Sequence, residues 1–168
     1  MITWQYYPKS DATPSHLVKL IEVFKQHSQE IDSSKLTLTS NNVLLILREG
    51  LQRTNYNVEM GNKLSDKINV AVLFGRDGKL DKSFHVDAFQ EETGTVVEIE
   101  AGRAVDNYQF LKDLFEACMM YNCQYLVIAV RRIYRKQADF EIVNMYFDTL
   151  YASGRIKLPL RGILIVGY

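Results

Sequence analysis

Three acidic residues stand at positions where a strand pattern would otherwise place apolar side chains. Asp87 follows Val86, and after ten further residues Glu98 and Glu100 flank Ile99. Because successive side chains of a strand point to opposite faces, the two glutamates share one face. Converging carboxylates repel one another, and a hard cation such as Mg²⁺, or Mn²⁺ in its place, removes that cost. A bland alternative stays open, in which the acids form the solvated face of an alternating strand.

The hydrophobic pattern predicts the elements that position these acids. Apolar residues at helical spacing indicate helices over 14–31, 40–54, 106–121 and 140–152, with Ser40 as the cap of the second. Apolar runs bounded by turn residues indicate strands over 56–60, 68–74, 83–90, 95–100, 125–130 and 162–167.

The spacing of these elements predicts an α/β fold. The strands 68–74, 83–90 and 95–100 are joined by tight turns, which favours an antiparallel meander. The segment 95–130 reads strand, helix, strand, so the strand 125–130 should cross over to lie parallel to 95–100. We expect one domain over residues 1–168, a mixed sheet flanked by helices.

Composition excludes several classes of protein. The chain has 168 residues, of which 47% are hydrophobic and 24% charged, with 20 basic and 20 acidic residues. Its two cysteines, Cys118 and Cys123, are too few for a disulfide framework. No apolar run approaches the roughly 20 residues that span a bilayer, and the N-terminus lacks a signal-peptide pattern. We therefore expect a cytoplasmic protein with no membrane partner.

The acidic residues and the order of the elements resemble the PD-(D/E)xK nuclease superfamily. The run consists of Asp87, ten residues, Glu98-Ile99-Glu100, a crossover helix and the buried strand 125–130. Within that superfamily the chain is most similar to type II restriction endonucleases of the BamHI and BglII kind. The resemblance extends from the helix at Val43 to the last strand, and it implies a restriction endonuclease-like core.

The resemblance also implies an activity, Mg²⁺-dependent hydrolysis of phosphodiester bonds in DNA by a homodimer. Asp87 matches the first metal-binding aspartate and Glu98 the second acidic ligand, and the carbonyl of Ile99 completes the set. Glu100 takes the place of the usual lysine, as in BamHI-type enzymes, and is a candidate general base. Glu49 lies on the helix that carries a further ligand in some members. Its alternative is an exposed partner of Arg53 at i,i+4.

The zero net charge conceals a separation of charge along the chain. Residues 87–100 carry five acidic and no basic residues, whereas residues 131–161 carry seven basic and three acidic residues. Candidate contacts to DNA phosphates are the basic residues just after the strands 95–100 and 125–130, namely Arg103, Arg131, Arg132, Arg135 and Lys136. The alternative is a solubilising loop.

One other function remains open from the sequence. With Glu100 in place of lysine, the protein is alternatively a nuclease-fold module that binds DNA or protein without cleaving. His85 is a candidate phosphate contact or an ordinary polar strand residue. The short chain leaves little room for a base-reading subdomain, which favours low sequence specificity.

Overall fold

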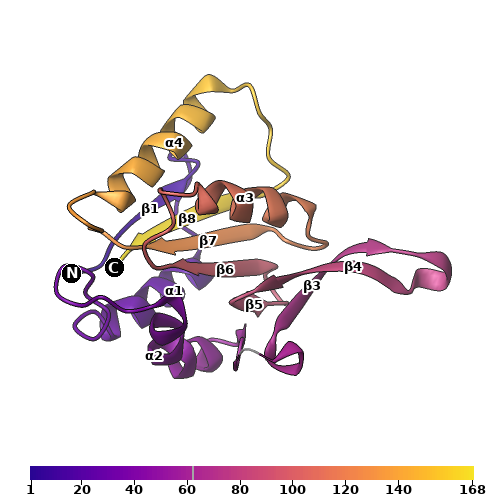
Figure 1. Ribbon diagram of the computed structural model, residues 1–168. Coiled ribbons are helices and arrows are strands. Elements are labelled where there is room, and N and C mark those ends of the chain that lie inside the picture. Colours follow the sequence, from indigo (N-terminus) through magenta and orange to yellow (C-terminus); the bar gives the residue numbers. More distant parts are fainter. Residues whose placement is uncertain (62) are drawn as a thin grey trace.

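A six-stranded mixed sheet forms the centre of the structure, a computed structural model that describes residues 1–61 and 63–168 (Figure 1). The strand order is β1–β8–β7–β6–β5–β2, with β6, β7 and β8 parallel and the others antiparallel to their neighbours. The strands are β1 (Thr3–Tyr7), β2 (Asn57–Val58), β5 (Ala88–Gln90), β6 (Thr95–Glu100), β7 (Tyr125–Val130) and β8 (Gly162–Gly167). The predicted parallel crossover from β6 to β7 is confirmed.

Helices cover both faces of this sheet, α1 and α2 on one face and α3 and α4 on the other (Figure 1). They are α1 (Ser15–Gln26), α2 (Ser40–Arg53), α3 (Gln109–Met119) and α4 (Asp139–Ser153), with short 3₁₀ turns at Leu64–Asp66 and Arg76–Gly78. On β7, Val127 packs toward α1 and α2, while Leu126 and Ile128 pack toward α3. This burial on both faces explains why β7 and β8 are continuous apolar runs. The α/β fold predicted from the sequence is therefore present.

Helix α2 begins one residue earlier than the sequence predicts. Ser40, predicted as the cap, is the first helical residue, and the hydroxyl of Thr39 accepts a hydrogen bond from the Asn42 N–H at 3.3 Å. Both residues are good caps, so the pattern alone does not separate them. Leu47 and Leu51 of this helix are fully buried against the sheet.

A separate antiparallel ribbon of β3 (Ile68–Phe74) and β4 (Leu80–Val86) extends away from the main sheet (Figure 1). The continuous strand predicted over 83–90 is thus interrupted at Asp87, which separates β4 from β5. The carbonyl of Asp87 accepts from the Glu59 N–H at 2.8 Å, and its carboxylate accepts from the Ile99 N–H at 2.7 Å. Its side chain thus takes a backbone donor of β6, where the chain passes from the ribbon to the main sheet.

Strand β1 is absent from the sequence-based predictions because 3–7 shows neither alternation nor a continuous apolar run. Its pairing with β8, from Thr3 opposite Gly167 to Tyr7 opposite Ile163, supplies the partner that makes it a strand. The hydroxyl of Tyr7 reaches α4 and donates to the Asp148 carboxylate at 2.9 Å.

No helix in the described part of the chain is long and apolar enough to cross a membrane.

Replacing Gly94 tests how tightly the β5–β6 turn is packed. Gly94 and Gly154 both have positive φ, but a Cβ on Gly94 would lie 2.1 Å from the Asn122 carbonyl oxygen, whereas one on Gly154 meets nothing within 4 Å. We expect Gly94→Ala to lower the free energy of unfolding by more than about 1 kcal/mol beyond the effect of Gly154→Ala. Urea unfolding measures both. Equal losses would contradict this packing.

Candidate active site

Asp87 is the residue around which the candidate site is built. It lies between β4 and β5, half-buried, with its carboxylate against the backbone of β6 through the Ile99 N–H. Burial raises the pKa of Asp87 to about 6, and the Glu59 carboxylate adds to the rise, while the Ile99 N–H and Lys67 oppose it. Asp87 is therefore a carboxyl group held in place by one backbone donor.

Glu98 and Glu100 lie on the same face of β6 as Val96, which packs toward α3 and α4. Burial and then the charge of Asp87 raise the pKa of Glu98 well above its ordinary value. Burial raises the pKa of Glu100 to about 8, and the nearby Asp113 and Asp87 carboxylates contribute to the rise. The structure therefore brings the three acids predicted from the sequence close enough to repel one another.

Asp113 of α3 is a fourth acid of this cluster, and sequence reasoning missed it. It is 5% exposed and accepts a hydrogen bond from the Gln109 side chain at 3.3 Å. Burial raises its pKa to about 7, and Glu116 and Asp87 add to the rise. The signal was present, because Asp113 stands three residues after Phe110 and thus on the buried face of its helix.

Glu59 is a second acid that sequence reasoning missed. It follows β2, is 7% exposed, and forms an ion pair of 2.6 Å with Lys67. Its negative charge raises the pKa of Asp87, and the Lys67 ammonium lowers it. No periodicity of the sequence marks this position, because the strand beside it has two residues.

Two other candidates from the sequence lie elsewhere. Glu49, the candidate helical metal ligand, is exposed and forms an ion pair with Arg53 one turn further along α2. His85 is exposed on the ribbon, opposite Asn69. Neither is among the groups whose charges act on Asp87, Glu98 and Glu100.

The basic residues after β7 divide into two kinds. Arg131 is 5% exposed and donates to the carbonyl oxygen of Leu38, and Arg132 pairs with Asp32 at 2.9 Å. These two guanidinium groups therefore connect the loop to the segment between α1 and α2. The remaining predicted phosphate contacts are exposed, namely Arg103, Arg135 and Lys136.

Tyr134 contacts two of the basic residues after β7, at the end of the sheet where Glu100 lies. The guanidinium groups of Arg131 and Arg135 lie 4.9 and 5.0 Å from the centre of its ring. The ring packs so closely on Gly102 that a Cβ there would be 2.6 Å from it. Because Gly102 directly precedes Arg103, this contact brings the loop after β7 to the loop after β6.

The chemistry of the acidic donors fits Mg²⁺, although their positions do not surround an ion. Among residues 1–61 and 63–168, no group of three or more His, Cys, Asp and Glu side chains is arranged to hold a metal. The cluster nevertheless offers only oxygen donors, the ligands that Mg²⁺ prefers. The pKa values of these acids are raised first by burial and then by neighbouring carboxylates, and a bound cation would offset both effects.

The fold is that of restriction endonucleases. The structure is similar to that of free BglII, a type II restriction endonuclease, with a TM-score of 0.52 over 99% of this chain and 78% of that chain. The two sequences are 12% identical, so the likeness concerns the fold. No protein-family model and no curated protein matches the sequence.

The raised pKa values of Glu100 and Asp113 predict that these two groups contribute less to stability as the pH rises. The folded state holds protons on Glu100 and Asp113 that the unfolded chain, with ordinary carboxyl pKa values near 4, releases. Without divalent cations, the stability from these groups is fully present below about pH 4 and is lost as the pH rises through their folded pKa values, about 7 and 8.

Asp113→Asn isolates this effect, because it removes a titrating group and keeps the shape of the side chain. Other shifted groups, such as His16 and Asp139, titrate in both proteins and cancel in the comparison. We expect the urea midpoint of the variant to fall less between pH 5 and pH 8.5 in EDTA than that of the parent. Parallel dependences of the two urea midpoints on pH would contradict the raised pKa of Asp113.

Proposed function

We propose that this protein is a Mg²⁺-dependent endonuclease that hydrolyses phosphodiester bonds in DNA. The observation that carries the proposal is the cluster of Asp87, directly before β5, with Glu98 and Glu100 of β6 in a restriction endonuclease-like sheet. Four mutually repelling carboxyl groups, with Asp113 as the fourth, cost folding free energy, and a cation-binding role accounts for their presence.

In this proposal the acidic residues have two roles, metal binding and proton transfer. Asp87, Glu98 and the carbonyl of Ile99 would hold Mg²⁺, with Mn²⁺ as a substitute. When bound, the ion would neutralise charge on the phosphate and make the attacking water more acidic. Glu100 would accept a proton from that water. The cation whose charge lowers the pKa of Asp87 is Lys67, whereas the superfamily that the sequence resembles usually has a lysine at the position of Glu100.

The exposed basic residues support DNA as the substrate. Arg103, Arg135 and Lys136 are exposed, and the contact of Tyr134 with Gly102 joins their two loops just beyond Glu100. Cations at that end of β6 would hold phosphates next to the acids. Arg131 and Arg132 would then act indirectly, by holding the loop through Leu38 and Asp32.

The proposal includes a homodimer, because cutting both strands requires two active centres related by a two-fold axis. Exposed apolar side chains on the outer side of α3 and α4 support it, among them Phe115 at 66% and Met145 at 59% exposure. A second copy that covered them would remove apolar surface from water.

Cleavage of supercoiled plasmid tests the activity. With Mg²⁺ or Mn²⁺ we expect nicking and linearisation, and we expect Asp87→Ala to reduce the rate at least about 100-fold, because it removes a ligand of the ion that stabilises the transition state. Glu49→Gln is the matched control, since Glu49 is an exposed acid paired with Arg53. Its rate should equal that of the parent.

The outcomes separate the two functions left open by the sequence. If the parent and Asp87→Ala behave identically across a range of both metals, the enzyme proposal fails. DNA binding without cleavage would then identify a nuclease-fold binding module.

DNA affinity in EDTA tests the role of the exposed loop. We expect Arg135→Ala combined with Lys136→Ala to weaken duplex binding and to lower the slope of log affinity against log salt by up to about 2, roughly one unit for each phosphate that the variant no longer neutralises. The control removes the same charge from α1 through Lys19→Ala and Lys25→Ala. If both double variants behave alike, general charge rather than this loop binds DNA.

A further inference from the structure

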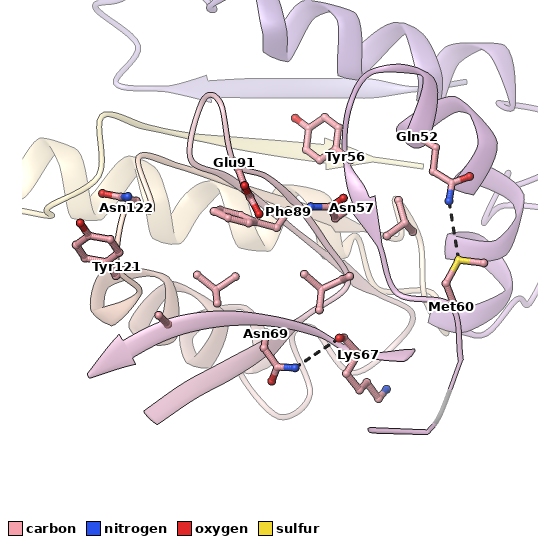
Figure 2. A pocket seen from close by; sticks show the side chains of 14 residues that line it. Gln52, Tyr56, Asn57, Met60, Lys67, Asn69, Phe89, Glu91, Tyr121 and Asn122 are labelled. Atoms are coloured by element: carbon pink, nitrogen blue, oxygen red, sulfur yellow. Dashed lines mark hydrogen bonds between the residues drawn. The ribbon is translucent and has the colours of Figure 1, made fainter. Parts of the chain in front are cut away.

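A cleft of about 860 Å³ opens between the ribbon and the edge of the main sheet (Figure 2). Its walls come from the end of α2, from β2 and β5, from the start of β3 and from the turn between α3 and β7. Neither the acidic cluster nor the basic loop after β7 contributes a lining side chain among the described residues. The proposed hydrolysis therefore leaves the cleft without a function.

Carboxamide side chains are the most frequent polar groups of the cleft. Gln52, Asn57, Asn69 and Asn122 line it, and Figure 2 shows them on different sides of the space. The side chains of Asn57 and Asn122 are exposed and make no hydrogen bond within residues 1–61 and 63–168. A carboxamide both donates and accepts, so it matches the paired donors and acceptors on the edge of a nucleobase.

Aromatic rings line the same space. Tyr121 is 57% exposed, yet its position is held by an edge contact with Phe74 at 5.2 Å and by its backbone N–H, which donates to the Ala71 carbonyl at 2.7 Å. Phe89 is half-buried at the floor. Exposed rings on fixed supports are stacking surfaces for bases.

The cleft lies next to the proposed active centre. Phe89 pairs with Val96, which stands two residues before Glu98 on the same face of β6. Lys67 lines the cleft, and its charge lowers the pKa of Asp87. A strand with a base in the cleft would therefore pass its backbone close to these acids.

We propose that this cleft binds unpaired nucleobases of a DNA strand, an inference that rests on the proposed nuclease function. Bases within a duplex expose mainly their edges in the grooves, whereas an unpaired base also exposes its faces, on which a ring can stack. A concave site also suits an extruded base better than the convex surface of a groove. Among the described lining residues, Lys67 is the single basic side chain and Glu91 the single acidic one. The lining therefore suits contacts with nucleobases better than contacts with phosphates.

Binding of a fluorescent single-stranded 12-mer of mixed sequence, measured by anisotropy in EDTA, tests the inference. We expect Tyr121→Ala to weaken binding at least about fivefold, because a stacking surface is removed, and Tyr121→Phe to keep it. Asn57→Ala should weaken binding as well. The matched control is Trp4→Ala, an exposed ring on β1 outside the cleft, which should leave the affinity unchanged.

The same variants are titrated with a blunt duplex of the same sequence. We expect duplex affinity to be unchanged by Tyr121→Ala, and a gapped duplex to behave like the single strand. Equal effects on single strand and duplex, or no effect of Tyr121→Ala and Asn57→Ala on either, would overturn the inference. Because EDTA prevents cleavage, a protein that binds in this way but does not cut leaves the inference standing and overturns only the proposed function.

Discussion

The hydrogen bond of 2.7 Å from the Ile99 N–H to the Asp87 carboxylate is the interaction on which the arrangement of the site depends. It holds the carboxyl group against β6 at the point where the chain leaves the ribbon and enters β5. The backbone carbonyl of Asp87 accepts a second hydrogen bond, from the Glu59 N–H. One residue thus joins β6, β5 and the segment after β2, and the ribbon, the acids and the cleft are positioned together.

This arrangement concentrates like charge in a region of low solvent access. The pKa values of Asp87, Glu100 and Asp113 are all raised, chiefly by burial and also by one another. Such a cluster destabilises the folded state at neutral pH unless protons or a cation neutralise it. The charges of opposite sign, on Arg103, Arg135 and Lys136, remain exposed at the end of the sheet instead of pairing with the acids. The carboxyl groups that lower the stability of the folded state are therefore those of the proposed active site.

Prediction from sequence succeeded where a local pattern carries the information. The strands 125–130 and 162–167 agree with β7 and β8, because burial on both faces demands continuous apolar runs. The strand 95–100 agrees with β6, because a turn precedes it and its glutamates alternate with apolar residues. Asp113 was within reach of the same reasoning, as an acid on the buried face of a helix. Strand β1 and Glu59 were not, because β1 exists through its pairing with β8 and Glu59 acquires its role from distant neighbours.

By itself the sequence determined the α/β class, the parallel crossover and the shared face of Glu98 and Glu100, since all of these follow from the period of side chains along a strand or helix. Only the tertiary structure decided which charges meet. It placed Arg131 and Arg132 in contacts with Leu38 and Asp32 and left the basic residues after them exposed. It also interrupted the predicted strand 83–90 at Asp87, between β4 and β5. Such contacts join residues far apart in the chain, and their energy depends on distance and burial that no local period encodes.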